Sequence, residues 1–109
     1  MVDSAMYSII FYVPENACEQ VKQAMFVEGA GAIGDYDQCS WQVLGQGQFH
    51  ALPSSQPFIG DQGTLTQLDE YRVEMVCESR RLHRVIKAMK IAHPYEQVAF
   101  HVTEHVNIL

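Results

Sequence analysis

The sequence has no long apolar run and no basic leader. Nowhere in its 109 residues do apolar side chains continue for the about 18 positions that a membrane-spanning helix needs. The start of the chain carries no basic region before its apolar stretch and no small-residue cleavage site after it, which argues against a secretory signal. We therefore expect a cytoplasmic protein that makes no membrane contact.

Basic residues are also few. Seven Lys and Arg stand against 13 Asp and Glu, and the formal net charge is -6. Such a balance argues against a general attraction to nucleic acid, so we expect no nucleic-acid partner. The stretch from 80 to 90 nevertheless holds most of the basic side chains. We interpret it as a solvated helix face.

The three cysteines do not form a recognisable pattern. Cys18, Cys39 and Cys77 are odd in number, widely spaced and without a C-x-x-C pair. Neither a disulfide framework nor a thiolate zinc site follows from them. We predict that all three are buried as small hydrophobic residues.

The spacing of the apolar residues predicts four strands and two helices. Strands are expected over residues 7–13, 39–50, 70–77 and 98–103. One helix follows Pro14 and ends near Gly29, and the other is capped by Ser79 and stopped by Pro94. This order predicts an α+β, ferredoxin-like βαββαβ sandwich, in which two helices cover one face of a four-stranded antiparallel sheet. We expect a single domain over residues 1–109.

Gly29, Gly31 and Gly34 have the G-x-G-x-x-G spacing of dinucleotide-binding loops. In those loops a strand precedes the first glycine and a helix begins at the last, so that the helix N-terminus faces the pyrophosphate. Here a helix ends at the first glycine and a strand follows the last. The order argues against a dinucleotide site, and Gly29 is interpreted as the left-handed residue after a helix. That interpretation leaves Tyr36 and Asp37 of the same loop without a role.

Four motifs resemble a known family. They are the G-x-G-x-I-G-x-Y-x-x-C-S that begins at Gly29, the G-x-G-x-F of Gly45, Gly47 and Phe49, the P-F-I-G of Pro57 to Gly60, and the H-P-Y-E of His93 to Glu96. With them, residues 6–103 are similar to the domain inserted in Nif-three-like proteins, the family named for NGG-one-interacting factor three. The resemblance implies the fold of CutA and PII proteins, which are ferredoxin-like trimers. It also implies that the dinuclear metal chemistry of the family lies in flanking catalytic lobes, which we expect this chain to lack as a stand-alone version of the inserted domain.

The resemblance favours a small oligomeric ligand-binding or regulatory module, with a trimer as the expected state and a dimer as the alternative. The glycine-rich loop and the long polar connection over residues 50–68 would line a cleft between subunits. The predicted ligand-binding residues of these two loops are Gly29, Gly31, Gly34, Tyr36, Asp37, Pro57, Phe58 and Gly60.

Two alternative functions stay open. A divalent metal, Zn²⁺ or Cu²⁺, is the cofactor that His93 and Glu96 would hold together, joined by His50 if the fold brings the strand ends close. The other interpretation of His93 is a helix-ending residue. An enzyme with its site in the glycine-rich loop, using Asp35, Tyr36 or Asp37, is the further alternative. No catalytic residue is assigned, and a module without enzymatic activity is favoured.

Overall fold

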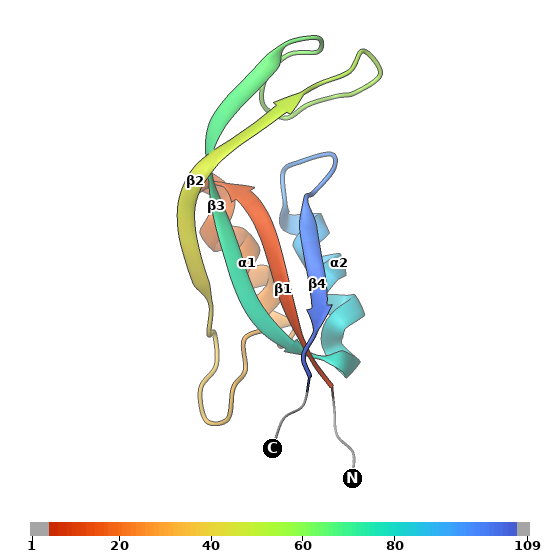
Figure 1. Ribbon diagram of the computed structural model, residues 1–109. Coiled ribbons are helices and arrows are strands. Elements are labelled where there is room, and N and C mark those ends of the chain that lie inside the picture. The colour runs from red at the N-terminus through yellow and green to blue at the C-terminus, as the bar shows by residue number, and fades with distance from the viewer. Residues whose placement is uncertain (1–4, 107–109) are drawn as a thin grey trace.

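The computed structural model describes residues 5–106 and has the predicted element order. The elements are β1 (Met6–Pro14), α1 (Cys18–Val27), β2 (Trp41–His50), β3 (Leu65–Glu78), α2 (Leu82–Ala92) and β4 (Phe100–Glu104). The sheet order is β2-β3-β1-β4, and each neighbouring pair is antiparallel. Both helices lie on the same face of the sheet (Figure 1). The α+β, ferredoxin-like fold is therefore confirmed.

The core lies between the helices and that face of the sheet. Ile9, Phe11 and Val13 alternate along β1 and are fully buried, as the period of two in a strand requires. The other fully buried members come from β3 and from both helices, and they are Val21, Met25, Val73, Val85 and Met89. Two of the predicted buried cysteines belong to this cluster, Cys18 and Cys77. The prediction is wrong for Cys39, which is half-buried because it lies in the loop after α1.

β2 and β3 continue far beyond the core as a two-stranded arm. Residues 45–50 of β2 pair with residues 65–70 of β3, and Figure 1 shows this arm curving over the segment that joins α2 to β4. The connection predicted over 50–68 is shorter than expected, because His50 ends β2 and Leu65 already begins β3. The arm has no apolar face against the core, so its residues lack the alternation that identifies a half-buried strand.

Both helices begin with a short 3-10 turn, Glu15–Ala17 before α1 and Ser79–Arg81 before α2. The predicted side-chain cap by Ser79 is wrong, since no side-chain hydrogen bond closes that helix start. The Ser79 N–H instead donates to the Ala5 carbonyl at 2.9 Å. None of the helices described over residues 5–106 is long and apolar enough to cross a membrane.

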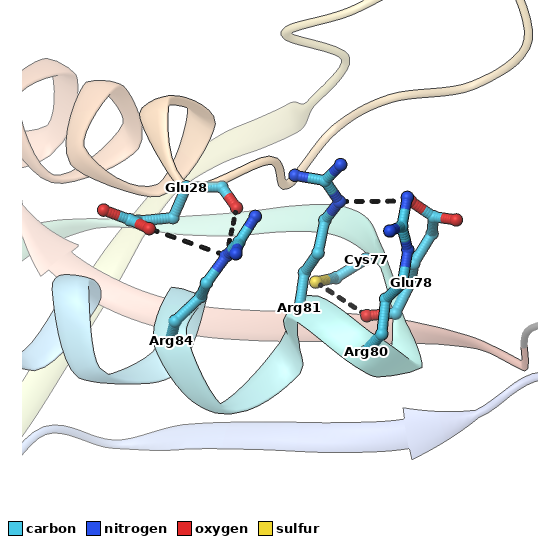
Figure 2. A network of polar contacts seen from close by, with 6 residues as sticks. All are labelled: Glu28, Cys77, Glu78, Arg80, Arg81 and Arg84. Atoms are coloured by element: carbon cyan, nitrogen blue, oxygen red, sulfur yellow. Dashed lines mark hydrogen bonds and ion pairs between the residues drawn. The ribbon is translucent and has the colours of Figure 1, made fainter.

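Acidic partners engage the basic residues at the start of α2 (Figure 2). Arg81 Nε lies 3.2 Å from Glu78 Oε1, and Arg80 lies 3.6 Å from the same oxygen. Arg84 Nε donates to the backbone carbonyl of Glu28 at 3.2 Å and lies 3.6 Å from its carboxylate. A cation at the C-terminal end of α1 stabilises that helix. These contacts support the interpretation of residues 80–90 as a solvated helix face.

Candidate functional site

A cleft of about 630 Å³ lies between the arm and the segment that joins α2 to β4. Its volume falls within the range of roughly 300 to 1,000 Å³ that is usual for small-molecule sites. Most of its walls are apolar or aromatic, and a few charged side chains enter it. The lining residues important for the site are Tyr12, Val43, Gly45, Gly47, Phe49, Pro57, Phe58, Glu70, Arg72, Tyr95 and Glu96.

Three of the four sequence motifs meet in this cleft. The glycines and phenylalanine of G-x-G-x-F lie on β2, the first residues of P-F-I-G lie in the loop at the end of the arm, and the last two of H-P-Y-E lie after α2. The three segments are far apart in sequence, so only the folded chain brings them together. The motifs that carry the family resemblance are thus largely the walls of one cleft.

Tyr95 and Glu70 join the arm to the segment before β4. The Tyr95 hydroxyl donates to Glu70 Oε2 at 2.7 Å. Burial, followed by this hydrogen bond, raises the pKa of Tyr95 above its usual value of 10.0. The phenol therefore remains a donor at neutral pH, and Glu70 remains its acceptor.

Gly47 leaves the space that the Glu70 side chain occupies. A Cβ on Gly47 would overlap Glu70 Oε1 and would lie 2.5 Å from its Cδ. Gly45 lies two residues earlier on the same face of β2, and no heavy atom lies within 4 Å of the position that a Cβ would take there. A side chain at the second glycine of G-x-G-x-F would thus displace the Glu70 carboxylate of the neighbouring strand from its position.

His93 positions Tyr95 and does not itself line the cleft. It is buried, with 6% of its surface exposed, and its Nδ1 accepts a hydrogen bond from the Tyr95 N–H at 3.1 Å. Nε2 lies 2.7 Å from the Tyr12 carbonyl oxygen, so Nε2 carries the proton. The neutral imidazole thus donates one hydrogen bond, to the Tyr12 carbonyl, and accepts one, from the Tyr95 N–H. These two bonds account for a buried histidine just after α2.

Glu96 attaches the loop at the end of the arm. Its Oε1 accepts a hydrogen bond from the backbone N–H of Gln56 at 2.9 Å. This bond and the Tyr95–Glu70 bond hold opposite sides of the cleft together, one at the loop and one on β3. The H-P-Y-E segment therefore closes the cleft through two consecutive side chains.

The structure does not gather the three predicted metal ligands into one group among residues 5–106. Both ring nitrogens of His93 are engaged in hydrogen bonds, which leaves no free lone pair for an ion. Glu96 holds the arm loop, and His50 is exposed at the end of β2. Over residues 5–106, no group of three or more His, Cys, Asp or Glu side chains could hold a metal ion.

The predicted ligand-binding residues fall into two separate places. Pro57 and Phe58 line the cleft, and Gly60 lies in the same loop. The glycine-rich loop lies at the opposite end of β3, because the Gly31 N–H donates to the Val76 carbonyl at 2.8 Å. From Leu65 to Val76 the strand spans about 36 Å at 3.3 Å per residue, and the molecule extends 52 Å along its longest axis.

Within one chain the two loops therefore cannot share a cleft. The predicted members of the glycine-rich loop, Gly29, Gly31, Gly34, Tyr36 and Asp37, do not line the cleft under the arm. Asp35 and Tyr36 are exposed, and Tyr36 shows 75% of its surface. A site shared between the two loops would need a neighbouring subunit.

Sequence reasoning missed Glu70, Arg72 and Tyr12, and it assigned no ligand-binding role to Tyr95. All four residues lie on strands or turns whose amino-acid pattern does not distinguish them from strands and turns without a binding role. Arg72 lies on the face of β3 away from the helices, beside Tyr12 in the register, and forms an ion pair with Glu74. The available signal was the alternation of charged residues along β3, which places Glu70, Arg72 and Glu74 on one face.

The stability of the domain is expected to fall below about pH 6.5 because of His93. Burial lowers the pKa of His93 in the folded chain below its usual value of 6.5, although the Tyr12 carbonyl and Glu70 oppose the effect. The unfolded chain then binds the proton more readily. The contribution of His93 is complete above pH 6.5 and is lost as the pH falls toward the folded pKa, by up to about 1.4 kcal/mol per pH unit.

Urea denaturation between pH 4.5 and 8 measures this dependence, with His93→Gln as the test variant and His83→Gln as the control. The glutamine side chain does not titrate, so the curve of His93→Gln should be flatter below pH 6.5. His83 is exposed on α2, and its replacement should leave the slope unchanged. Equal slopes for wild type and His93→Gln would contradict the assignment.

No family model matches the sequence, but curated proteins do. The chain is 47% identical over 93 residues to the "GTP cyclohydrolase 1 type 2 homolog" of Mycobacterium tuberculosis, which covers 85% of this chain and 24% of that protein. The chain thus spans about a quarter of the length of the curated relatives that it matches. The activity in that name refers to the whole protein.

Solved structures give the same relationship. A Bacillus cereus protein related to NIF3 matches with a TM-score of 0.81 and 33% identity, over 98% of this chain and 27% of that one. CutA from Archaeoglobus fulgidus matches with a TM-score of 0.68 and 13% identity, over 95% of this chain and 87% of that one. GlnK from B. subtilis matches with a TM-score of 0.62 and 12% identity, over 96% and 87%. The last two show a shared fold.

Proposed function

We propose that this chain, which corresponds to the CutA/PII-like domain inserted in Nif-three-like proteins, is a small oligomeric module that binds a small ligand. The observation that carries the proposal is the cleft under the arm, where three motifs meet. Two side-chain hydrogen bonds, from Tyr95 to Glu70 and from Gln56 to Glu96, hold the arm over it. A formed cleft with apolar walls and few polar groups is the usual form of a ligand site.

The open face of the sheet supports assembly into an oligomer. Phe11 on β1 and Val73 on β3 are buried under the helices. Because side chains alternate along a strand, the residues next to them face away from the helices. The β2 residues that pair with those outward-facing residues lie on the same open face. On that face Trp41 is 57% exposed, and Val43, which also lines the cleft, is 44% exposed. β2 is also an edge strand, and edge strands in stable proteins are usually covered.

A second copy of the chain is the proposed cover for this face. A trimer is the expected state, as the resemblance to CutA and PII proteins implies, and a dimer is the alternative. In such an assembly the glycine-rich loop of one subunit would approach the arm loop of the next, which a single chain does not allow.

Trp41→Arg is expected to dissociate the oligomer to the 12.3 kDa monomer. Trp41 is exposed in the single chain and does not line the cleft, so the charge should block association without unfolding the domain. Leu44→Arg is the matched control, since Leu44 is 47% exposed on the opposite face of the same strand. Native mass spectrometry reads the subunit number of all three proteins.

Tryptophan fluorescence gives a second measurement, because Trp41 is the one tryptophan of the sequence. Its emission should shift to the red when the wild type is diluted below its association range. A wild type that is monomeric at tens of micromolar would contradict the oligomer. Dissociation by Leu44→Arg but not by Trp41→Arg would show that the interface lies on the face that carries Leu44, and it would contradict the proposed interface.

A further inference from the structure

The charged groups of the cleft are mainly acidic. Glu70, Glu96 and Arg72 line it, and the single cation among them already forms an ion pair with Glu74. The chain as a whole carries a net charge of -6, which adds to a negative potential at the cleft. The one basic side chain among these lining residues is thus partly neutralised by Glu74, which makes the cleft less favourable for an anion.

One oxygen of the Glu70 carboxylate is not used by Tyr95. Glu70 Oε2 accepts the hydrogen bond from Tyr95, whereas Oε1 lies over Gly47 at the β2 wall. Among residues 5–106, no side chain or backbone donor is bonded to Oε1. The Tyr95 bond fixes the orientation of this carboxylate, so its free oxygen has a defined position.

Aromatic side chains form part of the wall of the same cleft. Tyr12, Phe49, Phe58 and Tyr95 all line the same cleft. Aromatic faces attract cations and also pack against planar rings. A ligand that has both a ring and a positively charged nitrogen would therefore use the two main chemical features of the cleft.

We propose that the cleft binds a small aromatic cation, with its ring among the phenylalanines and its nitrogen at the Glu70 carboxylate. The inference rests on the proposed ligand-binding function and names the class of ligand. The charge on Glu70 selects against anions, and the apolar walls select against small inorganic cations that carry their hydration water.

Three probes with one ring and different charge test the inference. Benzamidine is a cation, benzamide is neutral and benzoate is an anion. Titration of each into ¹⁵N-labelled wild-type protein, followed by amide chemical shifts, locates and measures binding. Benzamidine should shift Gly45, Gly47 and Tyr95, and benzamide should bind about three- to tenfold more weakly. Benzoate should bind more weakly still.

Glu70→Gln isolates the role of the charge. The amide oxygen still accepts from Tyr95, so the cleft is kept, while benzamidine affinity should fall to that of benzamide. Asp69→Asn is the matched control, because Asp69 is the preceding residue of β3, exposed and outside the cleft. It makes the same change of charge and should leave benzamidine binding unaltered.

Each outcome decides between the two proposals. Binding of benzamide or benzoate in the cleft as tightly as benzamidine would overturn the cation and leave the ligand cleft standing. Equal weakening by Glu70→Gln and Asp69→Asn would show a general effect of net charge and would overturn the role of Glu70. The weakest dissociation constant expected of such small probes is about 10 mM. If none of the three probes shifted the amide signals of the cleft at about that concentration, both the inference and the proposed site would fail.

Discussion

Gly31→Ala is expected to lower the free energy of unfolding by about 2–4 kcal/mol. Gly31 has a φ of +81°, a conformation that costs an alanine about 1–2 kcal/mol. Its new Cβ would also lie 2.9 Å from the Cys39 carbonyl oxygen and 3.0 Å from the Cys39 nitrogen. Backbone atoms cannot move aside as the end of a side chain can, so the clash adds to the strain.

The same change would loosen the attachment of the glycine-rich loop. The Gly31 N–H donates to Val76 at 2.8 Å, and its carbonyl accepts from the Cys39 N–H at 2.9 Å. These two bonds connect the loop to β3 and close it upon itself. We expect the loss in stability to be accompanied by faster amide exchange at Cys39.

Gly34→Ala is the matched control for this prediction. Gly34 also has a positive φ, +57°, but no heavy atom lies within 4 Å of the position of its Cβ. Its replacement should cost only the strain of an alanine at positive φ, about 1–2 kcal/mol. Urea denaturation measures the free energy of unfolding of the two variants. If both lost the same amount, the close approach of the Gly31 Cβ to Cys39 would make no contribution to the free energy.

Gly47→Ala is expected to separate Tyr95 from Glu70 and to open the cleft. Its Cβ would occupy the space of the Glu70 carboxylate, which must then rotate away from the Tyr95 hydroxyl. A hydrogen bond to a charged group contributes about 1.5–3 kcal/mol, and partial exposure of this one to water places the expected loss near the lower value. Binding in the cleft should weaken with it.

Gly45→Ala and a double variant separate this effect from a general loss of strand stability. Gly45 lies on the same strand and face, with open space at its Cβ, so its replacement should be nearly neutral. On a Glu70→Ala background, Gly47→Ala should also cost little, because the overlapping side chain is gone. Chemical denaturation of the wild type, Gly47→Ala, Glu70→Ala and the double variant gives the four free energies of unfolding that the cycle needs. If Gly47→Ala lowered the stability on the Glu70→Ala background as much as in the wild type, the explanation would be refuted.

Much of the fold could be predicted because its signals are local. The alternation in β1, with Ile9 and Phe11 inward, and the i, i+3, i+4 spacing that includes Val85 and Met89 in α2 follow from burial against one core. Each such pattern is complete within one element. The order of the elements then leaves few ways to arrange them, and the ferredoxin-like sheet is one of those.

The candidate site was only partly predictable. The motifs pointed to Pro57 and Phe58 as ligand-binding residues and to Glu96 as a metal ligand, and all three line the cleft. They did not show that the glycine-rich loop lies at the other end of β3, because local sequence carries no information on which loops meet. The arm was missed in part for the same reason, since residues 65–69 pair with β2 away from the core.

By itself the sequence determined the elements, the core and the family resemblance, because these depend on periodicity and on motifs read within short windows. Only the tertiary structure decided the chemistry of the cleft. The bond from Tyr95 to Glu70 joins residues 25 positions apart, and the bond from His93 to the Tyr12 carbonyl joins residues 81 positions apart. Such contacts leave no periodic trace along the chain, since each depends on how the arm, the sheet and the end of α2 meet in space.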